Sequence, residues 1–163
     1  MSDLTLSIQR EMPGDADAIE RLHERAFGPG RYARAAERVR EQAGSDPRLN
    51  FMARVATLLV GSVRMTPIHI GAAPAVMLGP LAVEPAFHSR GIGRALMDKA
   101  INAAEEAGYP AILLVGDESY YGRLGFKRVA PGSIVMPGPV DPMRLLLRTT
   151  ADAGVYKGPV RGG

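Results

Sequence analysis

The sequence predicts a single α+β domain in which helices cover a sheet of mostly antiparallel strands. The chain has 163 residues, enough to bury one core. Two helical patterns come early, three strand patterns follow one another closely, and a strand–helix–strand unit comes after them. Strands joined by short turns favour an antiparallel meander, and helices segregated from it favour the α+β class. We expect residues 1–163 to form one domain, with a tail rich in Pro and Gly from about residue 150.

The first half of the chain supplies helices and then a hairpin. Residues 4–9 alternate apolar and polar side chains, which predicts a strand. An apolar stripe at helical spacing predicts a helix over 15–27, and a Gly-Pro-Gly break at 28–30 ends it. A second helix is expected over 31–42. Residues 51–70 are rich in Val, Ile, Leu and Met around one short polar interruption, which predicts a hairpin.

The second half supplies the strand–helix–strand unit. In chain order we expect a turn at 71–74, a strand over 75–83, a helix over 94–108, a strand over 111–116, a short helix over 118–124 and a strand over 125–129. The final segment is rich in Pro and Gly, and one clear strand is expected there, over 143–148. The rest of that segment is expected to be loop or ordered tail.

Composition and charge exclude several functions. The chain has no cysteine, which excludes disulfides, thiolate metal ligands and a cysteine nucleophile. His23, His69 and His88 lie far apart and lack the helical spacing of metal ligands, so no metal site is expected. The formal net charge is +3 and the basic residues are scattered, without a basic run or interleaved aromatic residues. Nucleic-acid binding is therefore not expected.

The sequence also lacks the patterns of export and membrane insertion. Its start, MSDLTLSIQR, has no basic segment followed by an apolar one, so no signal peptide is expected. No apolar stretch approaches the ~20 residues that a membrane span needs. We therefore expect a cytoplasmic protein that does not bind membranes.

The segment HSRGIGRAL, residues 88–96, is the strongest candidate for a binding site. Gly91 and Gly93 lie between a predicted strand and a predicted helix. The first N–H groups of a helix have no intrahelical partner, and the helix dipole adds positive charge there. Glycines leave room for a ligand to approach these groups, and Arg90 and Arg94 add two guanidinium groups. The segment therefore predicts an anion site, most naturally for phosphate.

The two glycines admit two other interpretations. They can simply permit a tight turn with close packing of the helix on the sheet. They can also belong to a dinucleotide fold, whose fingerprint is G-x-G-x-x-G. Leu96 stands where that fingerprint needs its third glycine, and the preceding strand follows a meander instead of opening the chain. No G-K-[ST] follows, so a P-loop is excluded.

The flanking residues carry a resemblance to a known family. The strand LGPLAV, the glycine segment and the later GDESYYGRLGF together resemble the GNAT superfamily of acyl-CoA-dependent N-acetyltransferases, in particular its YhbS-like members. The similarity covers about residues 77–129. It implies the GNAT fold, with a central, mixed, mostly antiparallel and splayed sheet flanked by helices. It also implies acetyl-CoA as cosubstrate and, as in many members, a homodimer.

The resemblance assigns the cofactor site to two segments. The family's phosphate loop, [QR]-x-x-G-x-[GA], falls on His88 to Gly93, with His88 in place of the usual Gln or Arg. Backbone N–H groups from about Arg90 to Ala95 are expected to hold the pyrophosphate. The cofactor residues implied here are His88, Ser89, Arg90, Gly91, Ile92, Gly93, Arg94 and Ala95. The backbone of Leu81, Ala82 and Val83 is expected to pair with the pantetheine, and the Leu81 N–H to polarise the thioester carbonyl.

The resemblance also assigns the proton donor. In the family a tyrosine four residues before a Gly-Phe pair often protonates the leaving thiolate and contacts the cofactor, and that position is Tyr121. Tyr120 points away from it on a helix and is assigned to packing. Leu114 replaces an asparagine that many members use. Asp117 is expected to cap the short helix, and Phe126 to anchor the last strands in the core.

The general base and the acceptor site have several candidates. Glu84 follows the cofactor strand and is a candidate base. His69 has an imidazole, which can exchange a proton near neutral pH. Glu24 and Glu37, on the early helices, can bind a cationic acceptor. Residues Arg31 and Tyr32 lie where acceptor loops occur in this family. Water can also carry the proton.

We therefore expect a cytoplasmic N-acetyltransferase that acts on the amine of a small molecule or peptide. The amine would attack the thioester directly in a ternary complex, without a metal. The alternative is an acyl-CoA-binding module, such as a sensor, with little catalysis.

Overall fold

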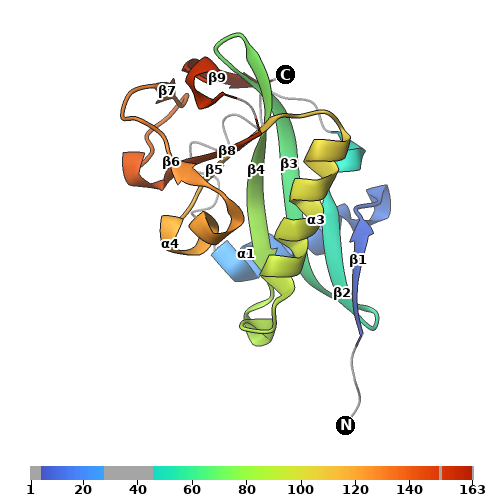
Figure 1. Cartoon of the computed structure of the whole chain (residues 1–163). Coiled ribbons are helices and arrows are strands. Elements are labelled where there is room, and N and C mark those ends of the chain that lie inside the picture. The colour runs from blue at the N-terminus through green and yellow to red at the C-terminus, as the bar shows by residue number, and fades with distance from the viewer. Residues whose placement is uncertain (1–4, 28–45, 151, 163) are drawn as a thin grey trace.

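The computed structural model describes residues 5–27, 46–150 and 152–162, and it has an α+β architecture (Figure 1). One sheet lies at the centre, with α1 (Ala16–Phe27) on one face and α3 (Ile92–Glu106) on the other. A short helix, α4 (Glu118–Tyr121), lies beside the sheet. The predicted fold class, a mixed and mostly antiparallel sheet flanked by helices, is confirmed.

The sheet contains the predicted antiparallel meander, formed by three consecutive strands between residues 51 and 83. Its strands are β1 (Leu6–Arg10), β2 (Phe51–Val55), β3 (Leu58–Ile70), β4 (Ala73–Val83), β5 (Ala111–Val115), β6 (Lys127–Arg128), β7 (Ile134–Val135), β8 (Leu145–Thr149) and β9 (Gly158–Gly162). They are arranged in the order β1-β2-β3-β4-β5-β8-β6, with β9 paired to β3 and β7 paired to β9. The two parallel pairs are β4 with β5 and β7 with β9, among the described strands. The helix expected over 31–42 lies outside the described residues.

The paired segment of β4 and β5 is short, and the point where it ends determines the position of the site. These strands pair only at Val76 with Ile112 and at Met77 with Leu113. Beyond this point β4 continues to Val83 along β3, whereas β5 turns with β8. The register of β3 with β4 shifts between Val63 and Met65, next to Gly79-Pro80, and such a bulge bends a strand. The sheet is therefore splayed at this point, as the family resemblance implied.

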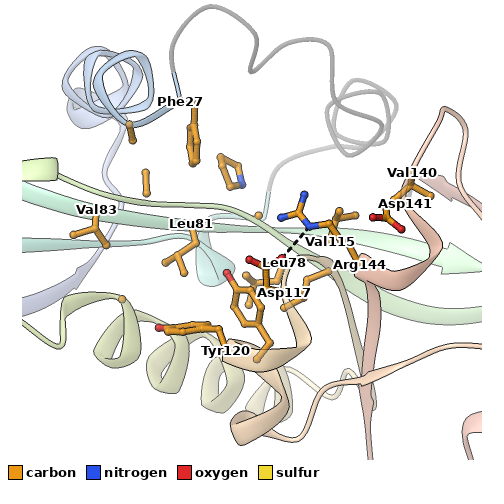
Figure 2. A pocket seen from close by; sticks show the side chains of 18 of the residues that line it. Phe27, Leu78, Leu81, Val83, Val115, Asp117, Tyr120, Val140, Asp141 and Arg144 are labelled. Atoms are coloured by element: carbon orange, nitrogen blue, oxygen red, sulfur yellow. Dashed lines mark hydrogen bonds and ion pairs between the residues drawn. The ribbon is translucent and has the colours of Figure 1, made fainter. Parts of the chain in front are cut away.

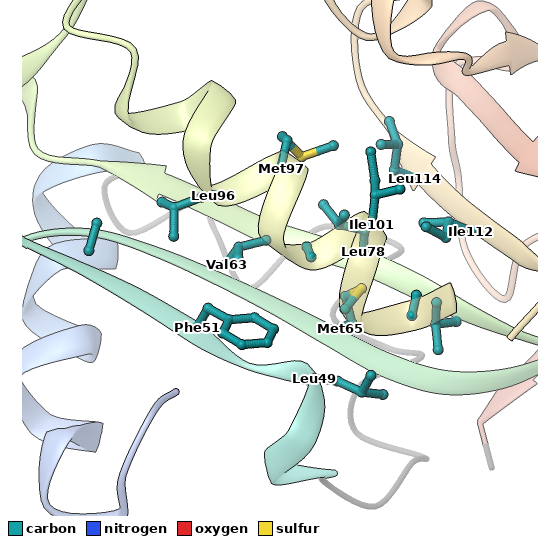
Figure 3. Close-up of a cluster of buried hydrophobic side chains, with 14 of the residues drawn as sticks. Leu49, Phe51, Val63, Met65, Leu78, Leu96, Met97, Ile101, Ile112 and Leu114 are labelled. Carbon is teal, nitrogen blue, oxygen red and sulfur yellow. The ribbon is translucent and has the colours of Figure 1, made fainter. Parts of the chain in front are cut away.

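Helix α3 packs on the sheet through small and apolar residues at helical spacing. Leu96, Met97 and Ile101 lie on Val63 and neighbouring strand residues (Figure 3). Gly61 of β3 permits this close approach, because a Cβ there would lie 2.8 Å from Cδ1 of Leu96. The helix begins two residues earlier than predicted, and this extension places its first turn at the splayed end of β4.

The C-terminal segment is more ordered than its composition suggested. The predicted strand over 143–148 is β8, which begins at Leu145 because Asp141-Pro142 starts a 3₁₀ turn. Two further strands, β7 and β9, were not predicted. β9 pairs with β3 at Ile68–Ile70, and its Val160 is buried in a second apolar cluster around β5 and β8.

Candidate functional site

A cavity of about 710 Å³ opens where β4 and β5 diverge (Figure 2). Its walls come from Leu78 to Val83 of β4, the end of β5, α4, the first turn of α3 and the C-terminal end of α1. Residues from 139 to 144, ahead of β8, complete it. The cavity therefore brings together the three segments that the sequence singled out: the strand LAV, the glycine segment and the double tyrosine.

The glycine segment forms the start of α3 as predicted. Gly91 is the N-cap residue and has φ of 76°, a left-handed conformation that glycine adopts without strain. The Ala95 N–H donates to the Gly91 carbonyl at 3.0 Å, which makes this the first bond of the helix. The N–H groups of the three residues before Ala95 therefore precede the helical ladder and can bind an anion.

Side chains of the glycine segment divide between the cavity and its surroundings. His88 and Gly93 line the cavity. Arg90 lies over the ring of Phe87 at 5.0 Å, and Arg94 pairs with Asp98 at 3.1 Å. Four other members of the predicted set do not line the cavity: Ser89, Gly91, Ile92 and Ala95. The side chain of Ile92 is buried in the core. The segment thus offers mainly its backbone, which is what the phosphate interpretation requires.

Alternate residues of β4 beside the cavity direct their backbone N–H and C=O groups to opposite edges of the strand. On one side, β4 pairs with β3 through Leu81–Val63, Ala82–Ser62 and Val83–Gly61. The Glu84 N–H donates to the Val60 carbonyl at 2.8 Å, and antiparallel strands alternate between bonded and non-bonded residues. Ala82 is therefore bonded to β3, while the backbone groups of Leu81 and Val83 face the opposite edge.

That edge is open. No described strand pairs with β4 beyond Met77 on the β5 side. The backbone groups of Leu81 and Val83 can thus pair with an extended ligand, as an added strand would. The expectation for Ala82 changes: this residue lines the cavity, but its backbone N–H and C=O groups are directed to β3.

Both tyrosines of α4 line the cavity. The rings of Tyr120 and Tyr121 meet edge to face, 4.8 Å apart at 83°. Tyr121 also packs against Phe126, which is 1% exposed and anchors the core as predicted. Tyr120 does more than pack, because it is 40% exposed and its hydroxyl lies 3.3 Å from the place of a Cβ on Gly93.

The environment of Tyr121 suppresses its ionisation. Burial raises the pKa of Tyr121 to about 12; Tyr120 and Asp117 add to the rise, and Arg144 opposes it. The phenol therefore keeps its proton at neutral pH and has an O–H group available to donate.

Sequence reasoning missed a polar group at the end of the cavity next to β8. Asp117 occupies the N-cap position of α4, but its side chain makes no capping bond, so that prediction was wrong. Its carboxylate instead accepts a hydrogen bond from Arg144 Nε at 3.2 Å. Asp141 also lines the cavity. Pairing of Val115 with Leu145 places residues 117 and 144 at one strand end, and this register could have revealed the pair.

The candidate bases and acceptor residues lie elsewhere. Glu84 does not line the cavity; it forms an ion pair with Arg25 of α1 at 2.7 Å. His69 lies opposite Pro74, at the other end of the β3–β4 hairpin from Leu81. Glu24 is exposed on α1 and does not line the cavity either. The structure therefore does not bring these three predicted residues together with Tyr121. Arg31, Tyr32 and Glu37 lie outside the described residues.

Two properties of the described residues bear on other functions. No group of three or more His, Asp or Glu side chains in ranges 5–27, 46–150 and 152–162 is placed to hold a metal ion. Within the same ranges, no helix has both the length and the apolar character needed to cross a bilayer.

The sequence pattern of the acetyltransferase (GNAT) family matches residues 16–126, more than half of the chain. Over 129 residues the chain is 29% identical to an uncharacterised N-acetyltransferase, YhbS of Escherichia coli (strain K12), covering 76% of this chain and 74% of that protein.

Solved structures agree with the sequence comparison. The GNAT family N-acetyltransferase YhbS from Escherichia coli, solved in complex with CoA, has a TM-score of 0.82 at 25% identity, covering 100% of this chain and 92% of that one. A GNAT family acetyltransferase from Brucella melitensis, in complex with acetyl-CoA, has a TM-score of 0.65 at 28% identity, covering 91% of this chain and 98% of that one.

Proposed function

Because the chain belongs to the acetyltransferase (GNAT) family, we propose that it transfers an acetyl group from acetyl-CoA to the amine of a small molecule or peptide. The observation that supports this most strongly is the open β4 edge, which shares one cavity with the start of α3 and with Tyr121. Relatives of the same family have been solved with CoA and acetyl-CoA.

The residues present fit this cosubstrate. The start of α3 leaves space for an anion, since a Cβ added at Gly91 would have no atom within 4 Å. The backbone groups of Leu81 and Val83 face the slot between β4 and β5, where the amides of a pantetheine arm can pair with them. His88 lies on the cavity wall beside this path.

When bound, acetyl-CoA supplies a thioester whose carbonyl carbon an amine can attack. In the transfer the amine loses a proton, a C–N bond forms, the C–S bond breaks and sulfur leaves as a thiol. The Leu81 N–H is suited to donate to the carbonyl oxygen, where negative charge develops. The Tyr121 hydroxyl is suited to donate a hydrogen bond to the leaving sulfur, and its raised pKa keeps it protonated for that role.

The proton lost by the amine needs an acceptor other than the predicted one. The Glu84 carboxylate is held by Arg25 outside the cavity, which weighs against its role as the base. Water in the open cavity is the simplest acceptor. The chain has no cysteine for a covalent acyl intermediate, which favours direct attack.

Thermal unfolding with and without acetyl-CoA tests the proposed cosubstrate. A ligand at about 100 times its Kd adds about 2.7 kcal/mol of stability, which corresponds to a shift of roughly 5 to 10 °C for a chain of this size. We expect this shift with acetyl-CoA and none with NAD. The absence of any shift with acetyl-CoA would overturn the proposal.

Release of free thiol in a panel of amines then separates an enzyme from the alternative, an acyl-CoA-binding sensor module. Thiol release that depends on an amine supports acetyl transfer. A melting shift without thiol release from any amine favours the sensor. A cytoplasmic location and a homodimer stay predictions. Cell fractionation checks the location, and light scattering checks the oligomeric state.

A further inference from the structure

The cavity has a charged end that the proposed interactions with acetyl-CoA do not use. This polar end consists of Asp117, Asp141 and Arg144. Arg144 Nε donates to Asp117 Oδ1 at 3.2 Å, and Asp141 Oδ1 accepts from the Met143 N–H at 2.9 Å. Figure 2 shows the Arg144 guanidinium extending into the cavity, opposite the end where Val83 lies. Within the described part of the chain, its two terminal nitrogens have no hydrogen-bond partner.

The backbone fixes the position of this guanidinium. The Gly116 N–H donates to the Arg144 carbonyl at 2.8 Å, which ties residue 144 to the end of β5. Tyr121, the last residue of α4, packs its ring against the backbone of Gly116. The Tyr121 ring and residue 144 therefore both contact the same strand end. The polar end is therefore next to the place where the amine must react.

A guanidinium with two unused terminal nitrogens is a typical carboxylate site. Its planar donors match the two oxygens of a carboxylate, and the bidentate contact fixes orientation as well as energy. Asp117 beside it carries the opposite charge, and its side chain is 70% exposed, so it can face an ammonium. A simple amine would meet Arg144 with unfavourable charge, whereas a molecule with both charges matches both residues.

The walls near the polar end are apolar. Phe27 of α1, Leu78 of β4 and Val140 all line the cavity. Such walls suit an apolar side chain and exclude water from it. The same cavity therefore offers an anion site, a cation site and an apolar surface.

We propose that the acceptor is an amino acid with an apolar side chain, whose carboxylate binds Arg144 and whose amine lies beside Asp117. This inference rests on the proposed function, because it places the acceptor in the cavity assigned to acetyl transfer. Arg144 is thus a residue that determines specificity, and Tyr121 remains the group that contacts the leaving sulfur.

Direct binding tests the inference without dependence on turnover. The protein is saturated with CoA, and calorimetry measures the Kd of three matched series: the free acid, the amide and the decarboxylated amine of leucine, methionine and phenylalanine. In at least one series, we expect the Kd of the acid to be at least tenfold lower than the Kd of its amide and of its amine. Differences in reactivity among the amino groups of the three compounds do not affect a measured Kd.

Variants identify the residue responsible. Arg144→Gln should weaken binding of the acid at least tenfold and change binding of the amide less than twofold. Arg144→Lys, which keeps the charge without the planar fork, should give an intermediate loss. Arg128→Gln is the matched control, because Arg128 Nε pairs with Glu118 at 3.0 Å and the two arginines are 47% and 49% exposed. Arg128 does not line the cavity, so its variant should bind like the wild type.

The outcomes separate the inference from the proposed function. Equal binding of acid and amide, binding of the amine alone, or no binding in any series overturns the inference; so does a preference that survives in Arg144→Gln. Binding of the amine alone would indicate that Asp117 and Asp141 recognise a cation. The proposed function fails separately, if acetyl-CoA does not raise the melting temperature. With an acceptor in hand, Arg144→Gln should raise KM more than it lowers kcat.

Discussion

The ring of Tyr121 lies directly against the backbone of Gly116, where no side chain separates them. A Cβ added at Gly116 would overlap the Cε2 and Cδ2 edge of the ring. Glycine at the end of β5 thus sets how deeply the phenol enters the cavity. The contact connects a strand end to the group proposed to donate a hydrogen bond to the leaving sulfur.

Substitution of Gly116 by Ala should displace the Tyr121 ring and lower kcat on the order of 100-fold, because small misplacements of reacting groups are costly. The substitution needs no unusual backbone conformation, so the fold should persist. Gly122→Ala is the control, since a Cβ there would lie 3.7 Å from Glu118 Cγ, in ordinary contact. Steady-state kinetics of both variants check the prediction, and equal rates would contradict it.

The two tyrosines should differ in what their removal changes. Tyr121→Phe should lower kcat by roughly 10²- to 10⁴-fold and leave the Kd of acetyl-CoA unchanged. Tyr120→Phe should weaken acetyl-CoA binding a few-fold with a smaller effect on kcat, because the Tyr120 hydroxyl lies beside Gly93 at the start of α3. Kinetics and calorimetry separate the two parameters. The reverse pattern would assign the hydrogen bond to the leaving sulfur to Tyr120.

Tyr121 should be the tyrosine that ionises near pH 12. Ultraviolet titration of tyrosinate should show a step near the raised pKa of about 12, and the Tyr121→Phe variant should lack it. The folded pKa is above the ordinary value of 10.0, so the stability linked to this shift is complete below pH 10 and is lost as pH rises toward 12.

Stability measurements check the same shift. Between pH 9.5 and 11.5 the wild type should lose more unfolding free energy than Tyr121→Phe does. Two pKa units correspond to at most about 2.7 kcal/mol, and partial solvent exposure lowers this figure. Urea unfolding at several pH values measures it. Parallel losses in both proteins would show that Tyr121 titrates normally.

Gly91 should carry both a conformational and a binding role. Gly91→Ala forces a Cβ into the left-handed conformation, at a cost of about 1–2 kcal/mol, whereas Gly91→Asn should lose less, because asparagine tolerates that conformation. Both side chains obstruct the N–H groups at the start of α3, so both variants should bind acetyl-CoA at least tenfold more weakly.

Gly108 provides the matched control for Gly91. It has φ of 87°, it also has no atom within 4 Å of an added Cβ, and it lies just beyond the other end of α3. Gly108→Ala should therefore lose similar stability and keep its affinity for acetyl-CoA. Denaturant unfolding and calorimetry measure the two effects. Weakened acetyl-CoA binding in Gly108→Ala would show that stability alone explains the loss at Gly91.

Local patterns predicted the parts of the site that depend on backbone geometry. The glycines at 91 and 93 and the apolar strand before them are readable because a helix start and a strand edge have short sequence signatures. The family resemblance then placed Tyr121 beside them. The structure brings all three to one cavity.

The polar end of the cavity was not predicted, for a physical reason. Asp117 and Arg144 lie far apart in sequence, and only the antiparallel register of β5 with β8 brings them together. The position of Asp117 before a short helix predicts a capping bond, but its carboxylate accepts a hydrogen bond from Arg144 instead. Glu84 was likewise interpreted from its neighbours in sequence, while its partner Arg25 comes from a distant helix.

Strand β9 pairs with an edge of β3, a strand that is synthesised much earlier. Its pairing with Ile68–Ile70 joins residues 90 to 94 positions apart. A ribosome adds about 5–20 residues per second, so that part of β3 waits roughly 5 to 20 s for its partner during synthesis. A nascent chain that has not yet released residues 158–162 therefore presents an unpaired strand edge, a target for chaperones and a site for aggregation.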